Sequence, residues 1–128
     1  MTLDSSALLA MLFGEPGYLD LVDRILEADE VRVGAPTMVE ASMVFSGRAK
    51  SADGGELEAL LRELGVTVVP FAEREWRLAA DAFRKFGRGR HVAGLNFGDC
   101  LAYATAASLG DTLLFVGDDF RKTDIRPA

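Results

Sequence analysis

Hydrophobic positions along the chain follow two different periods, and their alternation predicts a layered α/β fold. Short apolar and β-branched runs predict strands at residues 2–3, 30–34, 66–69 and 112–116. Apolar residues at helical spacing predict helices at residues 7–13, 18–28, 37–49, 56–64, 73–86 and 97–109. Because strands and helices alternate, we expect α/β layering around a mostly parallel sheet.

Capping and breaking residues set the expected boundaries of these elements. Ser5 or Ser6 is expected to cap the first helix and Asn96 the last one. Pro36 suits the first position of the helix that follows the second strand. Residues 50–55 are predicted to form a polar loop.

The composition of the chain excludes several classes of protein and several kinds of site. We expect one domain over residues 1–128, because no linker divides the sequence. The 14 basic and 20 acidic residues give a net charge of −6, which argues against a general coat for duplex DNA. One cysteine and one histidine exclude an internal disulfide and a structural zinc site, and they fit a reducing, cytoplasmic location. The longest uncharged run, residues 100–110, is shorter than the about 20 residues of a membrane span, and no secretory signal is expected at the start.

Acidic residues follow the predicted strands in a way that brings them to one edge of the sheet. Asp4 comes directly after the first strand, and Glu40 lies in the opening turns of the helix after the second. Asp99 lies in the first turn of the helix that precedes the last strand, and Asp118 and Asp119 come right after that strand. Since the carboxyl ends of parallel strands share an edge, we expect these acids to lie close together.

Each acid also fits an ordinary structural role when taken singly. Asp4 suits the start of a turn, Glu40 an exposed helical position, and Asp99 the favourable field of a helix N-terminus. Asp118 and Asp119 suit a solvated turn. Taken together, the five acids fit these ordinary structural roles less well, because Glu40 and Asp99 have apolar neighbours in the sequence.

Carboxylates crowded in a partly desolvated site need a cation to remain ionised together. Oxygen-only ligands select a hard ion such as Mg²⁺ or Mn²⁺. Such an ion polarises a phosphoryl oxygen and activates water, which requires no serine, cysteine or histidine nucleophile. The sequence therefore predicts hydrolysis of a phosphodiester.

A basic cluster follows the strongly amphipathic helix predicted at residues 73–86. One side of that helix carries Trp76, Ala79, Ala80 and Phe83. The cluster comprises Arg84, Lys85, Arg88, Arg90 and His91. It fits two interpretations equally well, a solvated helix end or a clamp that leads the phosphates of a nucleic acid toward the acids.

Four motifs together resemble the PIN-domain ribonucleases, and more narrowly the VapC toxins of bacterial toxin–antitoxin pairs. They are LDSSAL at 3–8, Glu40 after Pro36-Thr37, NFGDCLAYA at 96–104, and LLFVGDDF at 113–120. The resemblance covers essentially the whole chain. It implies a three-layer α/β/α sandwich with a mostly parallel sheet, a homodimer, and Mg²⁺- or Mn²⁺-dependent cleavage of single-stranded RNA, often tRNA or rRNA. It also implies a VapB-type antitoxin that blocks the acidic cleft.

The resemblance assigns roles to individual residues. Asp4, Glu40 and Asp99 match three family acids, and Ser6 matches a hydroxyl residue that supports the metal ligands. Asp119 aligns best with a fourth acid, and Asp118 is the alternative. The last motif departs from the family form, because Phe115 and Gly117 stand where a threonine and an aspartate are common.

The leading hypothesis is a metal-dependent endoribonuclease that acts as the toxin of a type II toxin–antitoxin pair. Two alternatives remain open at this point. An aspartyl-phosphate phosphatase would use Asp4 as its nucleophile, although Ser6 stands where such enzymes usually carry a second aspartate. A non-catalytic module of the same fold would bind RNA or a protein partner without turnover.

Overall fold

The computed structural model describes residues 1–49 and 55–128, and its described strands form one parallel sheet. The strands are β1 (Thr2–Leu3), β2 (Arg32–Gly34), β3 (Thr67–Val69) and β4 (Leu113–Leu114). Their order is β3-β2-β1-β4, and each neighbouring pair is parallel. Leu3 is in register with Val33 on one side and Leu114 on the other, so β1 lies in the interior of the sheet.

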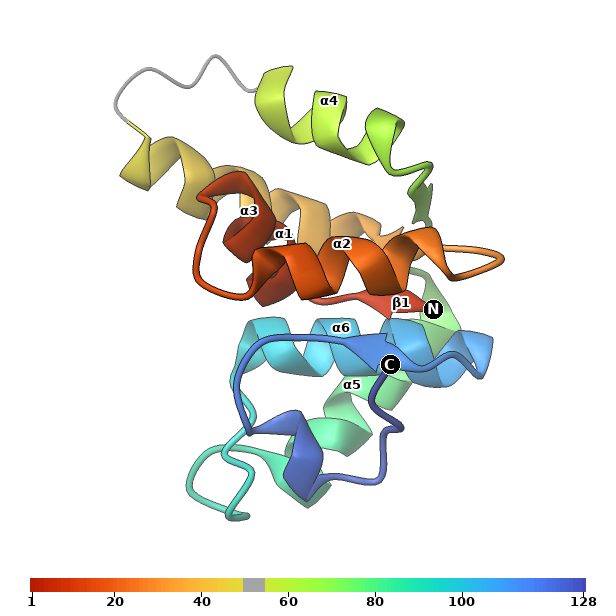
Figure 1. Cartoon of the computed structure of the whole chain (residues 1–128). Coiled ribbons are helices and arrows are strands. Elements are labelled where there is room, and N and C mark those ends of the chain that lie inside the picture. Colours follow the sequence, from red (N-terminus) through yellow and green to blue (C-terminus); the bar gives the residue numbers. More distant parts are fainter. Residues whose placement is uncertain (50–54) are drawn as a thin grey trace.

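Helices cover both faces of this sheet (Figure 1). One layer contains α1 (Ser5–Leu12), α2 (Tyr18–Leu26), α3 (Ala35–Arg48) and α4 (Gly55–Glu63). The opposite layer contains α5 (Glu73–Phe86) and α6 (Phe97–Leu109), and a short 3₁₀ helix, η1 (Phe120–Lys122), follows β4. The predicted α/β/α sandwich with a parallel sheet is confirmed.

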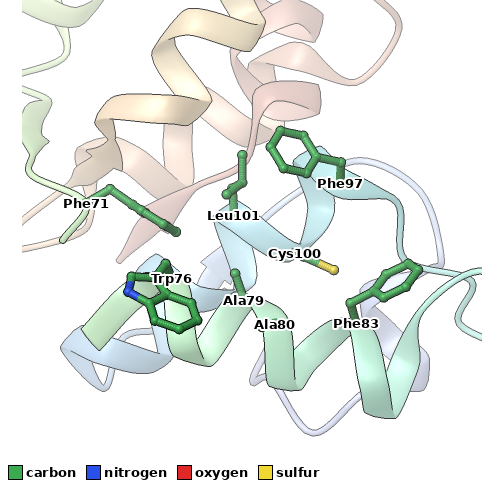
Figure 2. Close-up of a pocket in the computed structure, with 8 residues that line it drawn as sticks. All are labelled: Phe71, Trp76, Ala79, Ala80, Phe83, Phe97, Cys100 and Leu101. Carbon is green, nitrogen blue, oxygen red and sulfur yellow. The ribbon is translucent and has the colours of Figure 1, made fainter. Parts of the chain in front are cut away.

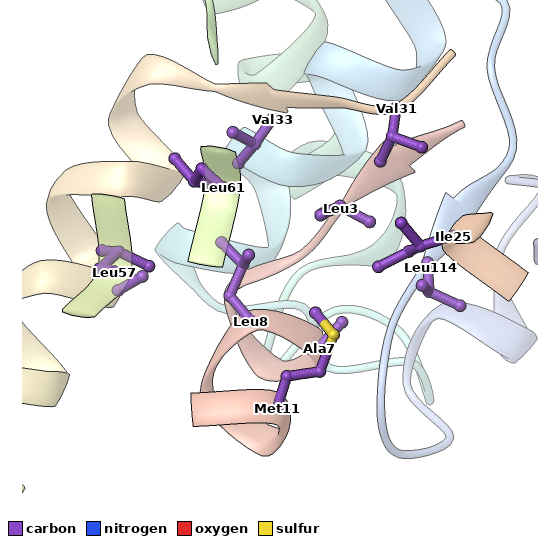
Figure 3. Close-up of a cluster of buried hydrophobic side chains, with 11 residues drawn as sticks. Leu3, Ala7, Leu8, Met11, Ile25, Val31, Val33, Leu57, Leu61 and Leu114 are labelled. Atoms are coloured by element: carbon purple, nitrogen blue, oxygen red, sulfur yellow. The ribbon is translucent and has the colours of Figure 1, made fainter. Parts of the chain in front are cut away.

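Two apolar cores lie between the sheet and the two helical layers. Leu3 and Leu114 belong to the first core, with Leu8 of α1 and Leu57 and Leu61 of α4 (Figure 3). The second core lies under α5 and α6, and it includes Leu95, Ala102, Ala104, Ala106 and Leu113. The consecutive residues Leu113 and Leu114 therefore belong to opposite cores, as expected from the two-residue period of a strand.

Several element boundaries differ from those that the sequence predicted. The last strand covers Leu113–Leu114, a shorter stretch than the predicted 112–116. The cap of α1 is Asp4 and not the expected Ser5 or Ser6, because Asp4 is extended and accepts a hydrogen bond from the Ser6 amide. Asn96 caps α6 as predicted.

The predicted loop at 50–55 lies outside the described residues, except for Gly55, which begins α4. Among the helices of the described chain, none has both the length and the apolar character required to cross a membrane.

Candidate active site

Asp4 lies at the centre of the candidate site, directly after the interior strand β1. Its amide donates to the carbonyl of Leu114 at 2.9 Å, which extends the pairing of β1 with β4 by one residue. Its Oδ2 atom accepts hydrogen bonds from the Ser6 amide at 3.0 Å and the Ser6 hydroxyl at 2.5 Å. Asp4 is only 3% exposed, and its buried Oδ1 has no hydrogen-bond partner in residues 1–49 and 55–128. One carboxylate oxygen is thus fixed by Ser6, and the other is left for a ligand.

Ser6 connects Asp4 to the segment that follows β4. While its Oγ donates to Asp4, it also accepts a hydrogen bond from the Val116 amide at 3.0 Å. The chain continues from Val116 to Asp118 and Asp119. Ser6 therefore orients the Asp4 carboxylate and holds the acidic segment after β4 at the same edge of the sheet.

Glu40 and Asp99 reach this edge from two different helices. Glu40 lies in α3, and its carboxylate lies against Gly98 in the first turn of α6. Its Oε2 atom is buried and has no hydrogen-bond partner in the part of the chain that the structure describes. Asp99 is half-buried; its Oδ2 accepts from the Asn96 amide at 2.7 Å, and its own amide donates to Asn96 Oδ1 at 3.0 Å. This reciprocal cap fixes the start of α6, and with it the position of Asp99.

Burial and mutual repulsion act on these carboxyl groups together. Burial raises the pKa of Asp4, and the charge of Asp99 raises it further, against the Ser6 hydrogen bonds. The pKa of Glu40 is raised first by burial and further by the charges of Asp4 and Asp99, whereas a hydrogen bond from Ser5 lowers it. Burial also raises the pKa of Asp99, and the Asn96 cap lowers it. The three acids are therefore close enough for their charges to interact.

Asp119 belongs to the same electrostatic group, although its side chain is exposed. Its charge raises the pKa of Asp99. A salt bridge of 3.9 Å links it to Lys122 in η1. The neighbouring Asp118 is also exposed and pairs with Arg121 at 3.7 Å. Of these two predicted alternatives, Asp119 is the one whose charge acts on Asp99.

The predicted basic cluster is exposed, and one of its members acts on the acidic site. The charge of Arg88 lowers the pKa of Asp99. Arg84 pairs with Asp81 in α5, and the Arg90 guanidinium lies 5.5 Å from the centre of the Phe83 ring. The cluster further contains Lys85, which is exposed, and His91, whose Nδ1 accepts from the Ala93 amide at 3.1 Å.

The donor set fits a hard divalent cation in its chemistry. Oxygen atoms are the ligands that Mg²⁺ and Mn²⁺ prefer. Asp4 Oδ1 and Glu40 Oε2 are two such atoms, buried and without a hydrogen-bond partner in the described residues. No three acidic, histidine or cysteine side chains of the described chain form a ready-made set of metal ligands. To surround an ion, side chains would therefore have to rotate; Asp119 is exposed, and it would have to leave its salt bridge with Lys122.

Two structural features next to the acidic residues were not predicted from the sequence. The first is the contact of Gly98 with Glu40, whose only signal is a glycine in the opening turn of a helix. The second is an apolar surface that α6 forms with α5 on one side of Phe97 and with α3 on the other. A hollow of about 440 Å³ is lined by Phe71, Trp76, Ala79, Ala80, Phe83, Phe97, Cys100 and Leu101 (Figure 2).

A second apolar hollow, of about 480 Å³, lies on the other side of Phe97. It is lined by Pro36, Val39, Glu40, Met43, Val44, Phe97, Gly98 and Leu101. Phe97 is 80% exposed and belongs to both hollows. The apolar side of α5 that the sequence predicted is thus partly solvent-exposed, with Trp76 51% and Phe83 40% exposed.

Known proteins similar to this chain agree with the fold. The PIN domain family matches residues 1–126. Ribonuclease VapC30 of Mycobacterium tuberculosis is 39% identical over 126 residues, which cover 98% of this chain and 95% of that protein. Ribonuclease VapC42 of the same organism is 39% identical over 129 residues, which cover 100% and 98% of the two chains.

Two solved structures share the fold at low sequence identity. One is VapBC2 from Rickettsia felis bound to a DNA fragment from its promoter, with a TM-score of 0.78 and 12% identity over 99% of this chain and 96% of that one. The other is VapC20 of Mycobacterium tuberculosis, described as a toxin that cleaves the sarcin-ricin loop, with a TM-score of 0.77 and 12% identity over 99% and 97%. Together with the family match and the two relatives, they show that the chain belongs to the PIN-domain family, among the VapC-type ribonucleases.

Proposed function

We propose that the protein is a metal-dependent endoribonuclease and the toxin of a type II toxin–antitoxin pair. The observation that carries this proposal is the pair of buried carboxylate oxygens, on Asp4 and Glu40, that lack hydrogen-bond partners in the described chain and lie at one edge of the sheet with Asp99. A bound Mg²⁺ or Mn²⁺ ion would polarise a phosphoryl oxygen of the RNA and favour ionisation of water. Asp4 and Asp99 would be its principal ligands, with Glu40 and Asp119 completing the set or orienting the water.

Water is the nucleophile in this proposal, and it attacks phosphorus in line. The products are a 5′-phosphate and a 3′-hydroxyl. Single-stranded RNA of the tRNA or rRNA class is the proposed substrate. Arg88, whose charge lowers the pKa of Asp99, would contact the RNA backbone beside the acids. Arg84, Lys85, Arg90 and His91 would extend this contact along the strand.

Two protein partners belong to the proposal. A VapB-type antitoxin would cover the acidic edge, and both proteins would act in the cytoplasm. A VapBC pair is among the solved structures that share this fold. A second copy of the chain would cover the two apolar hollows. In a two-fold interface both copies present the same surface, so that surface must fit itself. Phe97 lies between the two hollows, so the Phe97 side chain of each copy can insert into a hollow of the other copy.

The dimer is tested separately from catalysis. Phe97→Glu is expected to convert the dimer to a monomer in sedimentation equilibrium, because a charge would be buried at the centre of the interface. Leu26→Glu is the matched control, since Leu26 is 67% exposed on α2, away from this surface. Equal masses for both variants and the wild type would reject this interface.

RNA cleavage in Mn²⁺ and in EDTA tests the nuclease itself. Cleavage is expected only with the metal, and its products should carry 5′-phosphate ends. Asp99→Asn should lose at least about 100-fold in rate while it keeps the far-ultraviolet circular dichroism of the wild type. Ends with 2′,3′-cyclic phosphate, or full activity of the Asp99 variant, would contradict the mechanism. A phosphoryl group trapped on Asp4 would favour the phosphatase, and RNA binding without turnover would favour the non-catalytic module.

A further inference from the structure

Gly98 occupies the second position of α6, between the exposed Phe97 and the acidic Asp99. It is buried, and the carboxylate of Glu40 lies directly over its α-carbon. A β-carbon at this position would lie 2.6 Å from Glu40 Cδ and 2.5 Å from Oε2. Non-bonded carbon atoms normally lie about 3.5–4.0 Å apart. The Glu40 carboxylate therefore occupies the space that any side chain at residue 98 would take.

The backbone gives no other reason for a glycine here. Gly98 does not have the left-handed conformation found at Gly89, Gly94 or Gly110, so an alanine fits its backbone angles. Alanine also favours a helix over glycine, by up to about 1 kcal/mol. The glycine is thus unfavourable for α6 alone, and the space that it leaves is used by Glu40.

The space left by the missing side chain of Gly98 allows the Glu40 carboxylate to lie near Asp99. Glu40 comes from α3, and α6 would keep it at a distance if residue 98 had a side chain. On its other side Glu40 lines the apolar hollow with Val39 and Met43, where a displaced carboxylate would find no polar partner among the lining side chains. The position of the carboxylate therefore depends on the bare α-carbon of Gly98.

We propose that Gly98 is a positioning residue for the metal site: its missing side chain allows the Glu40 carboxylate to lie against α6, next to Asp99, where both can serve the same ion. This inference rests on the proposed metal-dependent function. The three atoms nearest to an added β-carbon all belong to the Glu40 carboxyl group, the end of a flexible side chain, so a side chain at residue 98 is expected to displace that group and to leave the helix in place. The substitution Gly98→Ala should therefore weaken metal binding without weakening the fold.

Calorimetric titration with Mn²⁺ and thermal unfolding in EDTA test the proposal together. Gly98→Ala is expected to lose about 10–100-fold in Mn²⁺ affinity, with a Tm in EDTA equal to or above that of the wild type. Gly47→Ala is the matched control, because Gly47 is an exposed helical glycine of α3 and its added β-carbon would meet no described atom within 4 Å. This control should keep the wild-type affinity for Mn²⁺.

Shortening Glu40 provides a rescue test. Glu40→Asp withdraws the carboxylate by about one bond, roughly 1.5 Å, and should restore part of the affinity when it is combined with Gly98→Ala. Wild-type Mn²⁺ affinity in Gly98→Ala would overturn the inference, and so would a lowered Tm in EDTA with no rescue by Glu40→Asp. Both results leave the proposed function standing, because the wild type binds the metal in each. Failure of the wild type itself to bind Mn²⁺ would overturn the proposed function and this inference with it.

Discussion

Asp4→Asn is expected to stabilise the metal-free protein and to destabilise it relative to the wild type once Mn²⁺ is present. Asp4 is 3% exposed, and its Oδ1 has no hydrogen-bond partner in the described chain. A buried polar group without a partner costs about 1–3 kcal/mol. Asparagine caps a helix as well as aspartate, so its one side-chain oxygen can take the place of Oδ2 and accept the hydrogen bonds from Ser6, with the amide nitrogen in place of the unpartnered Oδ1. Its amide can also donate toward Glu40, whose charge repels that of Asp4.

The expected gain in EDTA at pH 7 is about 1–2 kcal/mol in the free energy of unfolding. For a chain of 128 residues this corresponds to about 4 °C in Tm per kcal/mol. Mn²⁺ at a hundredfold excess over its Kd should stabilise the wild type by about 2.7 kcal/mol and the variant by much less. The order of the two Tm values should therefore reverse on addition of the metal.

The difference in EDTA should also depend on pH. The pKa of Asp4 is raised in the folded state, so the folded protein binds this proton more tightly than the unfolded chain. The wild type therefore loses stability as the pH rises through the folded-state pKa, and the advantage of Asp4→Asn should shrink in acid, where Asp4 is protonated. Differential scanning calorimetry from pH 4 to pH 7 measures both effects, with Asp23→Asn, an exposed position on α2, as the control. A variant less stable than the wild type in EDTA at pH 7 would refute the reasoning.

Three further substitutions test other parts of the molecule. Ser6→Ala removes the hydroxyl that links Asp4 to Val116, and should reduce Mn²⁺ affinity by about 10–100-fold in calorimetric titration; unchanged affinity would mean that Ser6 does not orient the ligand. Arg88→Ala should weaken binding of single-stranded RNA in EDTA and reduce the slope of log K against log salt by about 0.7, whereas the exposed Arg62→Ala on α4 should do neither. Leu8→Ala removes a fully buried side chain, and urea unfolding should show a loss of about 2–5 kcal/mol; a loss below about 1 kcal/mol would contradict its place in the core.

The order of elements was predictable because local patterns determine it. The helices at residues 73–86 and 97–109 have the bounds that periodicity predicted, and Asn96 caps the second of them. The strand edge at which Asp4 lies followed from the alternation of strands and helices, because parallel strands end at one edge. Strand lengths were predicted less well: the predicted strand at 112–116 is longer than β4, since an apolar run continues past the last ladder hydrogen bond.

Features that depend on contacts between distant segments were not predictable. A serine two residues after Asp4 does not reveal that its hydroxyl also holds the amide of Val116. Helical spacing assigned Trp76 and Phe83 to one side of α5, but it carries no information on whether another element covers that side. Likewise, the sequence places Gly98 beside Asp99 without indicating that Glu40 of another helix lies over it.

The candidate site combines features that oppose folding with features that hold it in place. Asp4 is buried beside other acids, which is unfavourable without a cation. It nevertheless has little freedom to move, because β1 is paired on both sides and Ser6 fixes one of its oxygens. Asp99 is fixed by its hydrogen bond with Asn96 at the start of α6, and Glu40 of α3 lies against Gly98 in the same turn. A strand in the interior of a sheet can hold an unfavourable charge where an exposed loop would move it into water. In the proposed function, a bound cation would remove the repulsion between the acids, and this relief would add to the free energy of metal binding.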